Sequence, residues 1–177
     1  MSATGGGLKK SGGCDGCPDA SAVSEQQISG NGTLTFAAPE ATSLRFVGLA
    51  AGGIGTGPAD INFALRLQSG VAEVREGGTY KSDVKFAAGD TFAIAVAAGV
   101  VKYSKNGSVF YTSAVRADRA VRAHAVFFTA NAAVASVGFS GTATTMAQAE
   151  PAAVDSTMSG VRYAIRRPEG SVPRRRR

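Results

Sequence analysis

The sequence predicts an all-β protein, folded as an antiparallel sandwich of two sheets. Three observations lead to this prediction: short runs alternate apolar and polar residues, glycine-rich turns separate the runs, and no amphipathic helix precedes residue 140. About ten to twelve runs follow one another at the regular spacing that is typical of a sandwich or barrel. The 23 glycines among 177 residues fit the large number of turns, and an apolar content of 44% suffices for a core.

The N-terminal third is expected to hold short elements joined by loops. Composition and alternation define each of them. In order, they are a mobile N-terminal segment (1–13), a tight loop (14–19), a polar edge strand (22–28), a turn (29–32), two strands (33–36 and 43–49) and a glycine-rich loop (52–58).

The central part of the chain gives the clearest pattern. Large apolar residues at 61, 63, 65 and 67 share one strand face, because side chains in a strand alternate with a period of two. The pairs Gly77-Gly78 and Asn106-Gly107 predict two-residue hairpin turns. Between the hairpins, large residues at 92, 94 and 96 alternate with alanines, which indicates a second layer packed close to the alanine side. Two closing strands are expected at 123–128 and 132–139.

Charge divides the chain into a nearly neutral body and a basic tail. Residues 1–140 hold 12 Lys/Arg and 10 Asp/Glu, a net charge of +2, while residues 141–177 hold 7 and 3, a net charge of +4. We therefore expect a folded domain at 1–140 and a disordered basic tail at 141–177, with a helix candidate at 144–153 that Pro151 interrupts. A neutral body is unlike a dedicated nucleic-acid-binding domain, which needs a basic face.

Several segments carry a resemblance to a known family. They are Asp60-Ile-Asn-Phe-Ala-Leu-Arg-Leu, Val71-Ala-Glu-Val-Arg-Glu, Ala88-Gly-Asp-Thr-Phe-Ala-Ile-Ala-Val and Lys102-Tyr-Ser-Lys-Asn-Gly-Ser-Val-Phe-Tyr-Thr-Ser, preceded by Leu8-Lys-Lys-Ser-Gly-Gly-Cys and Gly16-Cys-Pro-Asp-Ala-Ser-Ala-Val-Ser. From about Leu8 to Ser140 the chain resembles a bacterial module with the concanavalin A-like, lectin/glucanase-type jelly roll, whose hairpins also occur in SPRY domains. The resemblance implies two packed antiparallel sheets and recognition of glycans or other surface ligands.

The chain departs from that family pattern in three places. The opening strand, which often carries a tryptophan, is missing, and the sequence contains no Trp at all. One ring of the aromatic pair before the hairpin asparagine is replaced, because the pair reads Tyr103-Ser104. The usual arginine of the Gly-Asp strand is Ala93. Each change removes polar or aromatic surface on which a ligand would be bound.

The cysteines and the single histidine give no metal or redox centre. Cys14 and Cys17 form a Cys-x-x-Cys without the second ligand pair that zinc needs and without a βαβ setting, so we expect either a loop disulfide or two inert thiols. His124 lies in an apolar strand and is expected to be a half-buried strand residue rather than a general base. No cofactor is predicted.

The acidic residues and serines do not match the usual hydrolase patterns. Glu73 and Glu76 lie three apart and therefore point to opposite strand faces, whereas retaining glycosidases hold two carboxyls about 5 Å apart. No Gly-x-Ser-x-Gly elbow is present. The sequence therefore predicts a non-catalytic protein, with a glycosidase as a distant alternative.

The candidate ligand-binding residues lie on the central strands. Glu73 and Arg75 share a strand face and Arg66 lies on the preceding strand, so the three could bind a sugar or peptide by hydrogen bonds. The alternative is a cross-strand ion pair, worth about 0.2–1 kcal/mol. Tyr80 and Tyr103, together with Tyr111, could stack on a sugar ring, although at least one of these rings is expected to pack inside.

The C-terminal arginines are a candidate anion-binding site. Arg174, Arg175, Arg176 and Arg177 end the chain and could contact nucleic acid, acidic lipid or an acidic protein; a solvated terminal run is the alternative. Neither an apolar span of about 20 residues nor a secretory h-region is present, so the compartment stays open, with a cell-surface or extracellular place implied by the resemblance.

These observations predict a non-catalytic, lectin-like recognition module that binds carbohydrate. The alternative is a structural or protein-interaction domain of a surface appendage or larger assembly. A sandwich without one edge strand exposes unpaired backbone groups, so self-association through an edge strand is expected as a possible partner interaction.

Overall fold

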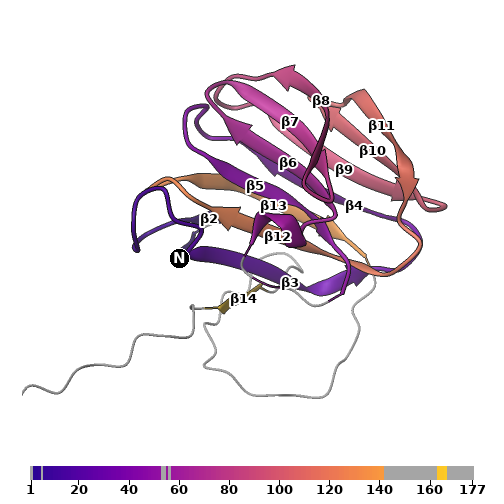
Figure 1. Cartoon of the computed structure of the whole chain (residues 1–177), viewed down its shortest axis with the longest axis horizontal. Coiled ribbons are helices and arrows are strands. Elements are labelled where there is room, and N and C mark those ends of the chain that lie inside the picture. The colour runs from indigo at the N-terminus through magenta and orange to yellow at the C-terminus, as the bar shows by residue number, and fades with distance from the viewer. Residues whose placement is uncertain (1, 5, 53–54, 56, 142–162, 167–177) are drawn as a thin grey trace, which may run out of the picture.

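Two antiparallel sheets form the protein. The computed structural model describes residues 2–4, 6–52, 55, 57–141 and 163–166. Each sheet has seven strands, and the two sheets lie face to face (Figure 1). The first sheet has the order β1-β2-β13-β4-β9-β10-β11 and the second β14-β3-β12-β5-β6-β7-β8. The prediction of an all-β, antiparallel jelly-roll sandwich is confirmed.

The elements run in this order along the chain: β1 (Ser2–Thr4), β2 (Gly7–Lys9), β3 (Ala20–Ile28), β4 (Gly32–Ala37), β5 (Arg45–Ala50), the 3₁₀ turn η1 (Pro58–Asp60), β6 (Phe63–Gln68), β7 (Val71–Glu76), β8 (Thr79–Lys85), β9 (Thr91–Ala97), β10 (Val100–Lys105), β11 (Ser108–Arg116), β12 (Val121–Phe127), β13 (Ala133–Ser140) and β14 (Tyr163–Arg166).

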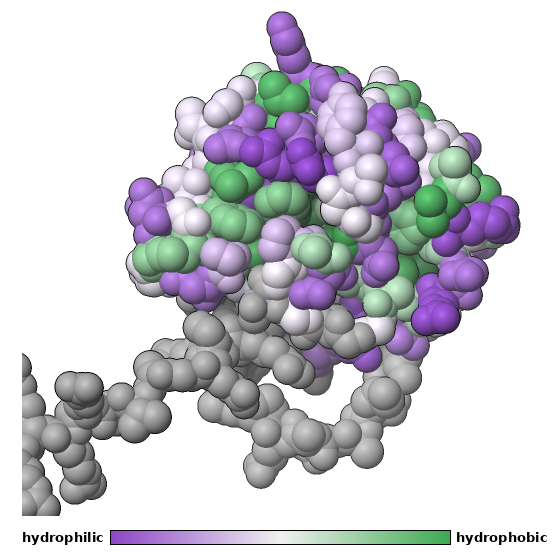
Figure 2. All heavy atoms as spheres, in the orientation of Figure 1, coloured by the Kyte–Doolittle hydropathy of each residue, from purple (hydrophilic) through white to green (hydrophobic). Residues whose placement is uncertain are grey.

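The main core lies between the two sheets. Alternate residues of each strand point into it, as the period of two requires. Phe36, Phe92 and Ile94 of the first sheet are fully buried there, together with Leu65 and Phe127 of the second. Burying one such side chain stabilises the fold by about 1.5–3 kcal/mol, so the core outweighs the surface ion pairs. The face shown in Figure 2 is mixed, with hydrophilic residues surrounding smaller hydrophobic patches.

Ile61 does not share the core face with Phe63, Leu65 and Leu67, contrary to the expectation. Those three residues enter the main core, whereas Ile61 belongs to a second buried cluster with Ala64 and Val126. The reason is that β6 begins only at Phe63, and Ile61 ends the 3₁₀ turn η1, where the period of two does not apply.

The second buried cluster lies on the outer face of the second sheet. Ala64 and Val126 alternate with core residues on their strands, so they point away from the main core. Gly48 allows the close approach of Ile61 there, because a Cβ at this position would lie 2.8 Å from an Ile61 side-chain carbon and 2.1 Å from the Phe63 carbonyl oxygen. The segment that ends at Ile61 therefore covers part of this outer face.

Both predicted hairpin turns are present. Gly77 and Gly78 join β7 to β8, and Asn106 and Gly107 join β10 to β11, all four with positive φ. Positive φ at both central positions is the mark of a type I′ turn. By contrast, among the described residues no second layer covers Ala93 and Ala95, which are half-buried on the outer face of β9.

The two exposed edge strands beside these turns both contain bulges. In β8, Arg75 pairs with Tyr80 and Val74 with Ser82, which leaves Lys81 as an extra residue. In β11, the pairs Val100↔Arg116 and Lys102↔Thr112 leave the three residues 113–115 opposite the single residue Val101 of β10, an excess of two. Bulges bend an edge strand and re-aim its side chains, and they are common next to functional sites.

The chain ends differ from the expectation where the structure describes them. The first residues, expected to be mobile, include β1 and β2, which pair with each other, and β2 also pairs with β13. Within the predicted tail, Tyr163–Arg166 forms β14 against β3, so disorder does not hold for these four residues. The helix candidate at 144–153 and Arg174–Arg177 lie outside the described residues, and the division at residue 140 stays a prediction. Among the described residues, no helix could span a membrane.

Candidate functional site

An open groove of about 420 Å³ lies at one end of the sandwich. It is bordered by the end of β5, the start of β6, the β7–β8 hairpin and the segment that joins β11 to β12. Its lining residues are Ala51, Asn62, Phe63, Glu76, Gly77, Lys81, Val115, Arg116, Ala117, Asp118, Arg119 and Val121.

Glu76 is the buried carboxylate of this groove. It ends β7, where Ala72 and Val74 point into the core, and the same alternation turns Glu76 inward. Its side chain is only 6% exposed. One oxygen, Oε1, accepts a hydrogen bond of 3.3 Å from the hydroxyl of Tyr103, and the other, Oε2, is buried with no partner among the described residues. A buried carboxylate oxygen without a donor is costly, so Glu76 is held in place at the expense of stability.

Tyr103 supplies the hydrogen bond to Glu76 from the opposite sheet. Burial raises the pKa of Tyr103 far above its usual value, and the neighbouring Glu76 charge raises it further. The phenol therefore keeps its proton and donates a hydrogen bond to the carboxylate. Tyr111 packs against Tyr103 with ring centroids 5.7 Å apart, and burial, followed by Glu76, raises the pKa of Tyr111 as well.

Both bulged edge strands deliver basic side chains to the groove. Lys81 is the extra residue of β8, and Arg116 follows the excess residues of β11, where the Ser113 hydroxyl accepts a hydrogen bond of 2.9 Å from the Val115 amide. Arg116 donates to the Ala98 carbonyl. Lys81 and Arg119 are exposed and have no ion-pair partner among the described residues. With the exposed Asp118, the groove carries three cations and two carboxylates.

Four of the five ligand-binding residues that the sequence predicted, Arg66, Glu73, Arg75 and Tyr80, lie close together on β6, β7 and β8. Tyr103 is the exception. Glu73 accepts from Arg66 at 3.0 Å and from the Arg75 Nε at 2.8 Å, so both of its oxygens are used. Tyr80, opposite Arg75 on β8, is 50% exposed and donates to Asp83, whose hydrogen bond raises the pKa of Tyr80. These residues form the ion-pair network that the sequence offered as the alternative to binding. Ligand binding there stays a prediction.

Tyr103 does not join this outer-face patch. It is fully buried between the sheets, as expected for at least one of the tyrosines. Glu73 and Glu76 do point to opposite faces, as their spacing predicted: Glu73 pairs with the half-buried Arg66 and Arg75, and Glu76 contacts the buried Tyr103.

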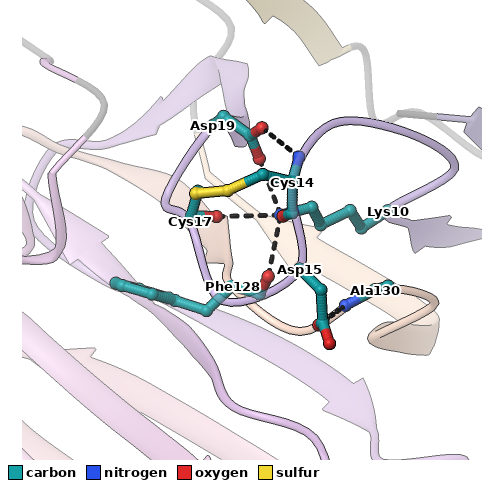
Figure 3. Close-up of a disulfide and its surroundings, with 7 residues drawn as sticks. All are labelled: Lys10, Cys14, Asp15, Cys17, Asp19, Phe128 and Ala130. Carbon is teal, nitrogen blue, oxygen red and sulfur yellow. Dashed lines mark hydrogen bonds and ion pairs between the residues drawn. A yellow bond between two sulfur atoms is a disulfide. The ribbon is translucent and has the colours of Figure 1, made fainter.

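Cys14 and Cys17 form a disulfide, with Cα atoms 5.5 Å apart. The loop that they close surrounds the ammonium of Lys10, which is 1% exposed (Figure 3). The Lys10 Nζ donates to the carbonyl oxygens of Cys14, Cys17 and Phe128 at 2.6, 2.8 and 2.7 Å. It also lies 2.6 Å from Asp19 Oδ1, and the hydrogen bond from Lys10 is the main cause that lowers the pKa of Asp19.

His124 is more deeply buried than the sequence indicated. It is 1% exposed, and neither ring nitrogen has a hydrogen-bond partner among the described residues. Burial lowers the pKa of His124 to about 4, and the charge of Asp60 acts weakly in the opposite direction. Among the described residues, no group of three or more His, Cys, Asp and Glu side chains is placed to hold a metal.

Sequence reasoning missed Glu76, Lys81, Arg116 and Arg119 as a group. One signal was available, because Glu76 continues the inward period of Ala72 and Val74, where an apolar residue would be expected. The positions of Lys81 and Arg116 depend on bulges, which the sequence does not reveal.

No family model matches the sequence, and no curated protein sequence matches it. Solved structures do share the arrangement of strands. An alginate lyase of polysaccharide lyase family 7 has a TM-score of 0.42 and 15% identity, covering 64% of this chain and 57% of the lyase. An alginate lyase from Corynebacterium sp. has a TM-score of 0.45 and 18% identity, covering 67% and 62%. A Caenorhabditis elegans galectin has a TM-score of 0.33 and 14% identity, covering 77% and 92%.

These likenesses concern the fold. The chain spans about three fifths of the length of the two lyases. The two lyases nevertheless contradict the prediction of a non-catalytic recognition or interaction module, and the prediction that the protein is not an enzyme is wrong with it. The physical reason is that a pair of carboxylates on one strand and a serine elbow are only two of the patterns that catalytic sites take. Neither of these local patterns detects a site whose residues come from several elements, as they do in the groove at Glu76.

Proposed function

We propose that this protein is an enzyme that cleaves an acidic polysaccharide, with its active site in the groove at Glu76. The observation that carries the proposal is the buried Glu76 carboxylate, whose Oε2 has no protein partner and whose Oε1 is oriented by Tyr103. A buried carboxylate that lacks a full set of hydrogen-bond donors and lines a concave site is a candidate for catalysis. The bulges that bring Lys81 and Arg116 to the same groove support this assignment.

The proposed chemistry is elimination from a uronate unit. The Glu76 carboxylate takes the proton from the carbon next to the sugar carboxylate, and a carbon–carbon double bond forms as the bond to the leaving glycosidic oxygen breaks. Water supplies the proton that the leaving oxygen needs. Lys81 and Arg119, which have no ion-pair partner among the described residues, neutralise the sugar carboxylate and stabilise the negative charge that develops on it.

Hydrolysis fits the groove less well. A glycosidase holds two carboxyl groups on either side of the scissile bond, one of them protonated. The groove has one buried carboxylate, Glu76, and its other one, Asp118, is exposed. Elimination requires a single base and a cationic partner for the substrate, and these groups are present.

The finer features of the family resemblance remain proposals. A bacterial origin, a SPRY-like character and action at or outside the cell surface follow from that resemblance and from no residue of the groove. The observed Cys14–Cys17 disulfide is consistent with an oxidising compartment. Within this proposal the partner is the polysaccharide itself.

Cleavage of defined polymers tests the proposal. The full chain is incubated with alginate, polygalacturonate and hyaluronan, and with neutral dextran and laminarin. Ultraviolet absorbance follows the unsaturated uronate, and a reducing-end assay follows any cleavage. We expect cleavage of one or more acidic polymers, lost by about 10²–10⁴-fold in Glu76→Gln, because the amide cannot take a proton. Glu73→Gln, on the opposite face of the same strand, is the matched control and keeps its activity.

Three results contradict the proposal in different ways. If none of the polymers is cleaved, the enzyme assignment fails. If reducing ends appear without ultraviolet absorbance, the reaction is hydrolysis. If Glu76→Gln retains full activity, the groove is not the active site.

A further inference from the structure

The Lys10 ammonium is a buried charge that the proposed active site does not use. It has four oxygen neighbours within 2.8 Å, three carbonyls and one carboxylate. An ammonium carries three protons, so these oxygens satisfy it completely. A buried charge is tolerated only while such partners stay in place. We call this arrangement the Lys10 cage.

The Lys10 cage joins three distant parts of the chain. Lys10 directly follows β2 of the first sheet, the Cys14–Asp19 loop leads into β3 of the second sheet, and Phe128 directly follows β12. Backbone hydrogen bonds reinforce the junction, because the Lys10 amide donates to Ala132 at 2.9 Å and the Gly16 amide donates to Phe128 at 2.9 Å. The ammonium therefore anchors β2 to both sheets.

The disulfide fixes the cage from outside. Two of the three caging carbonyls belong to Cys14 and Cys17 themselves, and the Cys14 amide is in turn held by Asp19 at 2.8 Å. Cys14 is exposed and Cys17 half-exposed, so a reductant reaches the bond while the protein stays folded. Lys10, by contrast, is almost completely enclosed.

We propose that the Cys14–Cys17 disulfide is a reducible lock on the N-terminal strands, acting through the Lys10 cage. A dithiol such as reduced thioredoxin or dithiothreitol supplies the two electrons. Its thiolate attacks one sulfur to give a mixed disulfide, and its second thiolate then displaces the cysteine, leaving two protein thiols and an oxidised reductant. Once Cys14 and Cys17 move apart, Lys10 loses two of its four oxygens.

The consequence of reduction is local. A buried ammonium with an incomplete shell moves to water, and β2 leaves β13 with it, together with β1, which pairs with β2. Leu8 is the residue by which β2 enters the main core, so the rest of the sandwich keeps its packing. Local opening of this kind is a sub-global unfolding step. It exposes the edge of β13 where Ala133 and Val134 pair with β2.

Hydrogen exchange of the full chain tests the proposal. Amide exchange of residues 7–10 and of β5 is measured by mass spectrometry with and without dithiothreitol, and free thiols are counted in the same samples. On reduction we expect exchange at residues 7–10 to accelerate by about tenfold or more, since each hydrogen bond to a charged group contributes about that factor. Exchange in β5 stays unchanged.

A matched variant separates the cage from a simple cross-link effect. Lys10→Met keeps the length of the side chain and removes its charge, so residues 7–10 are expected to exchange rapidly in both redox states. Intact protection of β5 shows that this variant is folded. If reduction accelerates exchange equally in the Lys10→Met variant and the natural chain, the disulfide acts without Lys10, and the proposal is overturned.

Measurements on the natural chain alone also test whether the disulfide holds the N-terminal strands in place. If its thiols are fully reduced while residues 7–10 keep their protection, the disulfide is not a lock. Neither result bears on polysaccharide cleavage, because the Lys10 cage and the groove share no residue.

Discussion

Two buried cations of the described chain have close oxygen partners, whereas the buried Glu76 Oε2 and both ring nitrogens of His124 have none. Lys10 has its oxygen cage, and Arg45, which is fully buried, donates to Glu40 at 2.5 Å and to the Ser43 carbonyl at 3.0 Å. Such partners offset the cost of removing a charge from water. His124 has none among the described residues, so it must stay neutral to remain inside the fold.

His124 makes stability depend on pH. Burial lowers its pKa from 6.5 to about 4, so between these values the unfolded chain binds a proton that the folded chain does not. Stability is therefore complete above about pH 6.5 and falls as the pH drops towards 4, by on the order of 3 kcal/mol. Urea unfolding at a series of pH values measures this loss.

The His124→Leu variant is the control for this pH dependence. It has no titrating group at the site, so its stability is expected to stay nearly level from pH 6.5 to 4. The lowered pKa of Asp19 affects stability only below its unfolded value of 3.8, whereas that of Glu40 acts below 4.5 and adds a loss at the acid end of the window in the variant and the natural chain alike. Equal pH profiles for the variant and the natural chain would show that His124 is not the cause.

At the residue scale, the sequence predicted what local spacing determines. Strand alternation places Glu73 and Arg75 on one face of β7, and the register Arg66↔Glu73 between β6 and β7 brings Arg66 beside them. The Lys10 cage could not be predicted, since three of its four oxygens are main-chain carbonyls and one of these, at Phe128, lies 118 residues from Lys10 along the chain. Glu76 was excluded from catalysis because it was compared only with its neighbour along the strand.

At the scale of elements, a latch connects the loop before β9 to the β10–β11 hairpin. Asp90 accepts a hydrogen bond of 2.8 Å from the Asn106 side-chain amide, and the Asn106 Oδ1 accepts one of 2.8 Å from the Thr91 amide. The hydrogen bond from Asn106 is the main cause that lowers the pKa of Asp90. Asn106 itself has a φ of 48°, in the left-handed region that asparagine tolerates.

Two substitutions separate the side chain of Asn106 from its backbone. Asn106→Gly loses the latch but keeps the left-handed backbone without strain, and we expect a stability loss of about 1–3 kcal/mol from the lost side-chain hydrogen bonds to Asp90 and Thr91. Asn106→Ala loses the latch and also pays about 1 kcal/mol or more for its Cβ at positive φ. Urea unfolding midpoints of both variants measure the difference. If Asn106→Gly is as stable as the natural chain, the latch does not stabilise the fold.

Strand positions and turns were predictable to a large extent, and bulges were not. Gly77-Gly78 and Asn106-Gly107 determine their turns through residues that accept positive φ, which is a local property. The bulges at Lys81 and at residues 113–115 depend on the register against a partner strand. Since those bulges orient the basic side chains of the groove, the candidate site lay beyond local sequence patterns.

On the scale of the whole molecule, the four outer strands of the two sheets are β1, β11, β14 and β8. β8 and β11 are bulged, which discourages pairing with another chain. β14 covers Ser21–Ser24 of β3. The predicted self-association through an edge strand is therefore expected at β3, whose outer side becomes unpaired when β14 is removed.

A chain that ends at Gly141 tests the role of β14. Without β14, the backbone groups of β3 at Ser21–Ser24 are unpaired, and we expect the shortened chain to associate as its concentration rises. Sedimentation velocity of the two chains over the same concentration range measures this. Identical behaviour of both would mean that β14 does not protect the edge. The same pair of chains tests the predicted binding of anions by the C-terminal arginines, which stays a prediction.

The latch between Asp90 and Asn106 has a consequence for finding relatives of this protein. Gly89-Asp90 and Asn106-Gly107 are among the most recognisable parts of the chain, yet their side chains contact each other and not the groove. A sequence profile weighted on these motifs would collect proteins that share the scaffold, whatever reaction or ligand each has. Under the proposed function, divergence in activity would instead be recorded at the groove residues Glu76, Lys81 and Arg119, to which such a profile gives little weight.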